Sequence, residues 1–196
     1  MEKDSGFRVQ ESAWNAILSK EGEVIGTGLT PDSCLLSPAL IIGYGNPYRR
    51  DDGVAWHVIN ALRARLGRPP LALDDTGEDN LGHAVDTVMA HQLVPEVALL
   101  LPPYSRVIFV DAHIGEIPVP LRVIEVEPGG EFQATTHHFG PGMLLSLAQA
   151  QSGTSPRGWL VSIRGDDFNY GETLTETCAS QVEPAVDEIM RLADTN

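Results

Sequence analysis

Apolar and polar segments alternate along the chain in a way that predicts strands followed by helices. The run "ALIIGYG", residues 39–45, is short and apolar and ends at a glycine, which predicts a buried strand. From residue 52 to 66, apolar residues recur at every fourth position, which predicts a helix that Gly67 ends. A loop rich in Asp, Gly and Asn follows, over residues 68–84.

The rest of the chain continues this alternation. Further strands are predicted in "AVDTVMA" (84–90), "RVIFVDA" (106–112), "LRVIEVEP" (121–128) and "GWLVSIRG" (158–165), and further helices at 94–101, at 141–150 and from residue 175 onward. The connection between the strands at 106 and 121 is too short for a helical crossover, which favours an antiparallel hairpin there. Pro184 lacks a backbone donor, so we expect a kink in the last helix or a break at Glu183.

This order of elements is typical of an α/β fold with three layers and a mostly parallel sheet. The strand from residue 121 is expected to be its antiparallel exception. Residues 38–196 are interpreted as one domain, and residues 1–37 as an N-terminal extension in which "ESAWNAILSK" predicts a short helix.

Composition narrows the classes of partner. The 196 residues include 13 Lys plus Arg against 27 Asp plus Glu, a formal net charge of −14, which opposes binding to nucleic acid or to an anionic membrane. Cys34 and Cys178 form no CxxC pair, which excludes a four-cysteine zinc site and fits a reducing cytoplasm. No signal-peptide pattern and no run of 18 apolar residues is present, so a cytoplasmic protein that spans no membrane is expected.

The glycine turn after the first strand does not fit a phosphate site. Gly43 and Gly45 are followed by Tyr48 where a dinucleotide fingerprint requires a third glycine, and no P-loop sequence occurs. Asp51 and Asp52 also put negative charge at the start of the predicted helix, where a phosphate would bind. Nucleotide binding is therefore disfavoured, and the two glycines are expected to act through backbone shape.

The aspartate pair has two interpretations. Aspartate is a favoured helix N-cap, and either residue alone is more often a cap than a catalyst. One carboxylate suffices for capping, however, and the second would lie at the carboxyl end of the sheet, where sites in α/β proteins are found.

A third aspartate and a histidine pair are expected at the same edge. Asp111 follows four apolar residues of a strand, and a buried acid is costly unless it is paired or binds a cation, although it could also cap a turn. His137 and His138 come just before Gly140 and the next predicted helix. Two carboxylates and one imidazole from three loops would form an open metal site suited to zinc, nickel or a similar ion.

In this order the motifs resemble those of the hydrogenase maturation proteases, the endopeptidases that trim the C-terminal peptide from the large subunit of nickel-iron hydrogenases. The specific motif is "GYGNPYRRDDGVAWHV", and "VIFVDAH", "THHFGPGMLLSLA" and "VSIRGDDFNYGETLTE" follow it between residues 39 and 193. The resemblance implies a twisted five-stranded sheet within three α/β/α layers. It also implies that a metal-contacting and catalytic trio falls on Asp52, Asp111 and His137. Further site candidates are Gly43, Gly45, Asn46, Asp51, His113 and His138.

The resemblance further implies that the nickel is carried by the substrate, the large-subunit precursor, rather than by the enzyme. The chain departs from the family pattern in its extension before residue 38, its longer and more acidic loop at 67–84, and the additional His113. No Ser-His-Asp or Cys-His motif is present. Two other functions stay open: a hydrolase of small substrates that carries its own metal, and a nickel-sensing chaperone that binds the precursor without cutting it.

Overall fold

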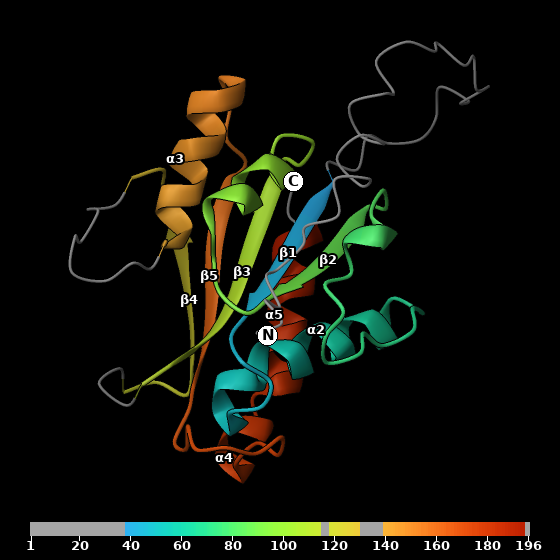
Figure 1. The fold of residues 1–196 in the computed structure, drawn as a ribbon, viewed down its shortest axis with the longest axis vertical. Helices are drawn as coiled ribbons and strands as arrows, with labels where there is room; N and C mark the ends of the chain where they lie inside the picture. Colours follow the sequence, from blue (N-terminus) through green and yellow to red (C-terminus); the bar gives the residue numbers. More distant parts are fainter. Residues whose placement is uncertain (1–37, 115–117, 130–138, 195–196) are drawn as a thin grey trace, which may run out of the picture. The chain divides into compact units, whose positions relative to one another are not determined.

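The computed structural model describes residues 38–114, 118–129 and 139–194, which form a five-stranded sheet flanked by helices (Figure 1). The strands are β1 (Ala39–Tyr44), β2 (Val85–Ala90), β3 (Arg106–His113), β4 (Leu121–Val126) and β5 (Arg157–Arg164). The α-helices are α2 (Val54–Arg65), α3 (Pro141–Ser152), α4 (Glu176–Ala179) and α5 (Val182–Asp194), and the 3₁₀ helices are η1 (Arg50–Gly53), η2 (Glu78–Asn80) and η3 (Pro95–Leu100). The helix predicted within residues 11–20 lies outside the described residues.

The strand order in the sheet is β2-β1-β3-β5-β4. β1 pairs in parallel with β2 and β3, β3 pairs in parallel with β5, and only β4 runs antiparallel to its neighbour. The predicted α/β fold with a mostly parallel sheet is thus confirmed. Because parallel strands run in the same direction, the ends of β1, β2, β3 and β5 lie at one edge of the sheet, which is the lower edge in Figure 1.

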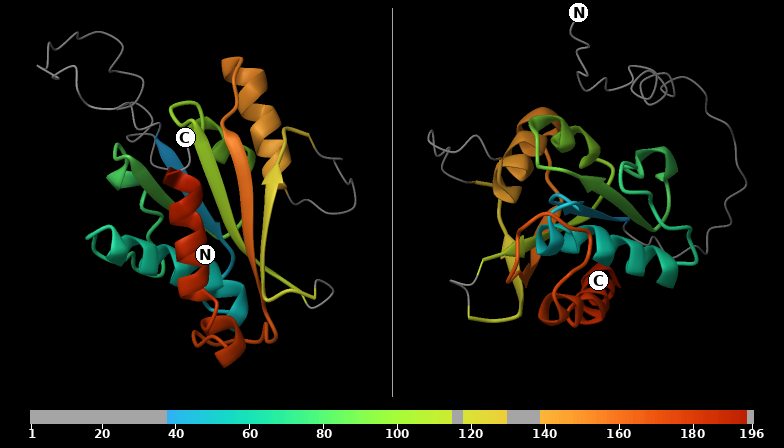
Figure 2. Two further views of the ribbon diagram at one scale, coloured as in Figure 1. Left: turned by 180° about the vertical axis from the view of Figure 1, so that it is seen from behind. Right: turned by 60° about the horizontal axis from the view of Figure 1, so that its bottom comes forward.

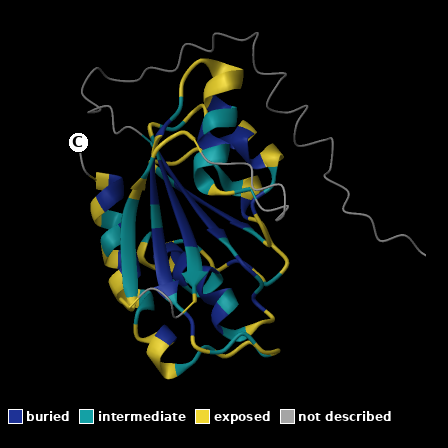
Figure 3. Cartoon of the chain, turned by 90° about the vertical axis from the view of Figure 1, so that its left-hand side faces the viewer, coloured by how far each residue is buried: buried dark blue, intermediate teal, exposed yellow. Residues whose placement is uncertain are grey.

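Helices cover both faces of the sheet, which gives the predicted three layers (Figure 2). On one face Ile41 of β1 packs with apolar residues of α2 and α5. On the other face Leu40 and Ile42 pack with apolar residues of η3 and α3. Side chains alternate along a strand, so Ala39 and Ile41 of β1 enter one core and Leu40 and Ile42 the other. The middle of the sheet is buried, as Figure 3 shows.

The hairpin predicted between the third and fourth strands is wrong. β4 pairs with β5 rather than with β3, and its register runs from Leu121 opposite Ile163 to Val126 opposite Gly158. β5 lies between β3 and β4 and forms a full-length parallel ladder with β3. Proximity in sequence favoured the hairpin, but the long apolar β5 provides the better partner for the buried β3.

The helix at the chain end also differs from expectation. The break falls at Ser180 and Gln181, between α4 and α5, and not at Glu183. Pro184 lies in the first turn of α5, where its missing N–H has no intrahelical partner to lose, so no kink is required. Among the described parts of the chain, no helix has the length and apolar character needed to cross a membrane.

Candidate functional site

The end of β1 and the turn that follows it each depend on a glycine. Gly45 has φ of 130°, and a Cβ added there would lie 2.2 Å from the carbonyl oxygen of Asp52. A Cβ at Gly43 would lie 2.8 Å from Ile59 and 2.9 Å from Met89. At Gly45 the backbone therefore folds back until residue 45 touches residue 52, whereas at Gly43 the missing side chain lets Ile59 and Met89 pack close against β1.

The two aspartates of the turn do not cap α2. Its N-cap position is Gly53, without any side-chain hydrogen bond. Asp51 is fully buried and accepts hydrogen bonds from Asp166 N (2.8 Å), Asp167 N (3.0 Å) and both Thr175 N and Thr175 Oγ1 (2.8 Å each). Burial raises the pKa of Asp51, but these hydrogen bonds together outweigh it and hold the pKa below its ordinary value. Asp51 is an anchor for the segment 166–175.

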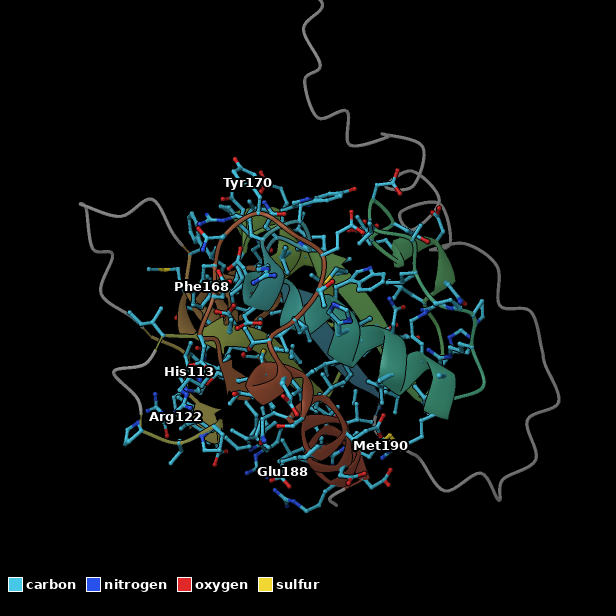
Figure 4. The ribbon with its side chains drawn as sticks, turned by 90° about the horizontal axis from the view of Figure 1, so that it is seen from below. His113, Arg122, Phe168, Tyr170, Glu188 and Met190 are labelled. Atoms are coloured by element: carbon cyan, nitrogen blue, oxygen red, sulfur yellow. The ribbon has the colours of Figure 1, made fainter. Side chains whose placement is uncertain are left out.

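The same segment is held by two arginines. Arg49 Nε and Nη2 donate to the carbonyl oxygen of Phe168 at 3.2 and 3.1 Å, and Arg50 forms an ion pair with Asp167. The backbone of Arg50 also donates to Gly171 O at 2.7 Å. Figure 4, which views this end of the molecule from below, shows Phe168 on the loop that these contacts fix. The loop between β5 and α4 is thereby fastened to the glycine turn.

Cys178 interacts with Asp51, and its thiol is poorly suited to act as a nucleophile. It is fully buried, and burial together with the neighbouring Asp51 carboxylate raises the pKa of its thiol to about 12. A thiol of this kind stays protonated at physiological pH, whereas nucleophilic attack needs the thiolate.

Asp52 is positioned differently from its neighbour. It is partly exposed, and within the described residues its carboxylate accepts one hydrogen bond, from Asn46 N to Oδ2 at 3.1 Å. Asn46 Oδ1 in turn accepts from Tyr48 N at 2.9 Å, which fixes the turn. Asp52 therefore keeps capacity to bind a further donor or a cation.

Asp111 lies near Asp52. It belongs to β3, two residues before the strand ends at His113, and its Oδ1 accepts from Ala112 N at 2.7 Å. Burial raises its pKa to about 6, helped by repulsion from Asp52 and opposed by the hydrogen bonds from Tyr44 and Ala112. The structure thus brings two of the predicted acids together at the carboxyl edge of the sheet.

Among the described residues, the predicted histidine His113 does not lie with the two carboxylates. Its Nε2 donates to Val119 O at 3.1 Å and its Nδ1 contacts Ser162 Oγ at 3.1 Å, so the ring connects β3 to β5 and to the segment before β4. His137 and His138 lie outside the described residues. Within the part of the chain that is described, no three His, Cys, Asp or Glu side chains gather closely enough to hold a metal ion.

A small pocket opens beside the glycine turn. Its wall includes Gly45 and Pro47 of the turn, Asp74 and Asp75 of the loop after α2, and His91, which directly follows β2. Because β1 and β2 end side by side, this pocket lies at the same edge of the sheet as the two carboxylates.

Sequence reasoning missed two residues of this region. The sequence pattern predicts Tyr44 only as part of an apolar strand, but it hydrogen-bonds to Asp111. The sequence pattern predicts Thr175 only as a helix start, but it both caps α4 and donates twice to Asp51. A signal for Tyr44 exists in the sequence, since Tyr44 and Asp111 are each the next-to-last residue of a predicted strand.

Comparison with known proteins identifies the fold. No protein-family model and no curated protein matches the chain. Among solved structures, the hydrogenase maturating endopeptidase HybD from E. coli aligns with a TM-score of 0.58 and 18% identity over 79% of this chain and 91% of that one. The hydrogenase maturation protease HycI from Thermococcus kodakarensis aligns with a TM-score of 0.56 and 19% identity, over 81% of this chain and 94% of that one. A hydrogenase 2 maturation peptidase from a Thaumarchaeota archaeon aligns with a TM-score of 0.52 and 21% identity, over 79% of this chain and 97% of that one.

The chain has the fold of the hydrogenase maturation proteases. The alignments extend over most of each solved protein, so the fold is shared as a whole and not as a fragment. At these identities the likeness concerns the arrangement of the backbone. The chemistry of the site has to be argued from its residues.

Proposed function

We propose that this protein is an endopeptidase that removes the C-terminal peptide from the large-subunit precursor of a nickel-iron hydrogenase after nickel has been inserted. The observation that carries the proposal is the pair of carboxylates, Asp52 and Asp111, at the carboxyl edge of a sheet with this fold, each with few hydrogen-bond donors among the described residues. Cys178, the cysteine among the described residues, has a buried thiol that is unsuited to attack a peptide bond.

The nickel in this proposal belongs to the substrate. Asp52 and Asp111 offer carboxylate oxygens to a cation that the precursor presents, and His137 completes the set of contacts. Repulsion between two nearby carboxylates is relieved when a cation lies between them, so the pair is better suited to the metal-loaded precursor than to the empty one. An acid with a pKa of about 6 also exchanges a proton readily near neutral pH, which suits Asp111 to activating water at the peptide bond.

The test mixes metal-free protein with nickel-loaded precursor and, separately, with nickel-free precursor, and follows the precursor mass. Loss of the C-terminal peptide only from the nickel-loaded precursor is expected. In a parallel reaction, Asp52→Asn should abolish cleavage while its melting temperature stays near that of the wild type, because Asp52 caps no helix. Asp194→Asn, at the exposed end of α5, controls for the loss of one negative charge.

Each other result would contradict the proposal in a recognisable way. Efficient cutting of nickel-free precursor by the metal-free protein would exclude nickel sensing. Binding of the nickel-loaded precursor without a change in mass would indicate a chaperone. Metal that copurifies with the protein, with no action on either precursor, would indicate a hydrolase with its own metal.

A further inference from the structure

Tyr44 lies beside Asp111 because of the register between β1 and β3. Gly43 is paired with Val110, so the next residue along each strand places Tyr44 next to Asp111. Both side chains lie on the η3 and α3 face, because Ile42 and Phe109, two residues earlier on their strands, belong to that core. Tyr44 itself packs against this core, and its hydroxyl hydrogen-bonds to the Asp111 carboxylate.

We propose that Tyr44 is a positioning residue that fixes the orientation of the Asp111 carboxylate toward the metal carried by the substrate. The proposal rests on the proposed function, since it assigns Asp111 a metal contact. No covalent step involves Tyr44; its contribution is a hydrogen bond from a side chain that packing holds in place.

The reason lies in the surroundings of Asp111. A carboxylate held only by Ala112 N, the neighbouring amide of its own strand, is free to turn about its side-chain bonds. A second donor, from Tyr44 on the adjacent strand, limits that rotation and still leaves lone pairs for a cation. Carboxylates that bind metals are themselves usually hydrogen-bonded, and loss of such a partner typically costs about 10- to 100-fold in metal affinity or activity.

Tyr44 is also coupled to Asp52 through the backbone. It directly precedes Gly45, whose close contact with the carbonyl oxygen of Asp52 closes the turn. Tyr44 is therefore connected to Asp111 by its hydroxyl and to Asp52 by the turn that follows it. A displaced ring would disturb the relative position of both acids.

The chain contains a matched control for this interaction. Tyr104 Oη donates to Asp86 Oδ2 at 2.8 Å, and Asp86 lies near the start of β2, at the opposite edge of the sheet from Asp111. Tyr104→Phe thus removes the same type of hydrogen bond from a buried aspartate far from the candidate site. Tyr44→Phe and Tyr104→Phe each remove one phenolic hydroxyl group and leave the ring in place.

The experiment compares both variants with the wild type, as full-length metal-free proteins. Cleavage of the nickel-loaded precursor gives kcat and KM, titration calorimetry with nickel(II) ions alone gives a dissociation constant, and thermal unfolding gives Tm. For Tyr44→Phe we expect kcat to fall and the nickel dissociation constant to rise by about 10- to 100-fold. For Tyr104→Phe we expect kcat and the nickel dissociation constant to stay at the wild-type values. Its Tm should decrease at least as much as that of Tyr44→Phe.

Wild-type cleavage and nickel affinity in Tyr44→Phe would overturn the proposal. Equal losses in both variants would also overturn it, because they would reduce Tyr44 to a purely structural role. If the wild type does not cleave the nickel-loaded precursor but nickel affinity still separates the two variants, the proposed function fails and the positioning role stands. If the wild type neither cleaves nor binds nickel, both fail.

Discussion

At the amino end of the sheet Asp86 accepts hydrogen bonds from Gly82 N, His83 N, the His83 ring and Tyr104 Oη. At the carboxyl end, counting the described residues, Asp111 accepts from one backbone amide and from Tyr44, and it lies near a second carboxylate. Each aspartate thus has a tyrosine partner, but only Asp86 is surrounded by donors. A buried carboxylate with its acceptors occupied contributes to stability, whereas one left with free acceptors beside a like charge is arranged for a ligand.

The adjacent residues Asp51 and Asp52 repeat this contrast within one turn. Four donors from the segment 166–175 occupy Asp51, whereas Asp52 accepts one hydrogen bond within the described residues. The number of donors around a carboxylate therefore separates anchoring residues from candidate site residues more clearly than burial or position in the sequence does.

The largest effect is expected from neutralising the two aspartates at the sheet ends. Asp111→Asn should reduce cleavage on the order of 10³-fold, because the lost charge can neither contact the metal nor take a proton. Asp86→Asn should instead reduce the free energy of unfolding by about 2–4 kcal/mol, since an amide cannot accept from the same donors, and its folded fraction should cleave normally. Cleavage assays and denaturant unfolding measure the two quantities. If Asp86→Asn lost activity without losing stability, the contrast between the two ends would be wrong.

The next effect concerns the contact between Gly45 and Asp52. Gly45→Ala forces a Cβ to within 2.2 Å of the Asp52 carbonyl oxygen unless the turn moves, so cleavage should fall on the order of 10²-fold. Gly67→Ala is the control, since Gly67 also has positive φ, at 71°, but a Cβ there meets nothing within 4 Å. It should lose some stability and no activity. Equal cleavage rates in the two variants would show that the contact does not position the site.

A smaller effect is expected from Asp51→Asn. Replacing one acceptor oxygen by an amide group should destabilise the fold by about 2–3 kcal/mol and release the loop that Asp51 anchors. Hydrogen exchange should quicken at the amides of Asp166, Asp167 and Thr175. Because the folded-state pKa of Asp51 is lowered, its stabilisation is present above its unfolded pKa and is lost as the pH falls through the folded pKa. The Asn variant should lack that acid-dependent loss.

The smallest effect is the pH dependence of stability at Asp111. Its pKa is raised from 3.8 to about 6, so the folded state binds the proton more tightly than the unfolded state. Stability should therefore decrease as the pH rises from about 4 to about 6, by about 1–2 kcal/mol for a partly exposed group. Denaturant unfolding of wild type and Asp111→Asn across this range should give a difference that grows with pH. A difference that stays constant with pH would mean that the pKa of the Asp111 carboxyl group is not raised in the folded state.

Much of the fold follows from local patterns in the sequence. The apolar run at 39–45, the four-residue spacing of α2 and the β-branched run of β3 predict their elements because each pattern states which faces of an element must be buried. The glycine turn is equally local: the close contact between Gly45 and Asp52 joins residues only seven positions apart. Asp111 could be placed at the edge of the sheet with Asp52 because parallel strands end together.

Tertiary structure alone decided the rest. The partner of β4 is β5 rather than β3, because pairing in a sheet depends on strands that come together from distant parts of the chain. The role of Asp51 as an anchor could not be predicted from the sequence, since its donors come from the segment 166–175. Tyr44 reaches Asp111 only through the register of β1 on β3. Local patterns specify which groups are buried, whereas the hydrogen-bond partners of a buried carboxylate are fixed only when the strands and loops have assembled.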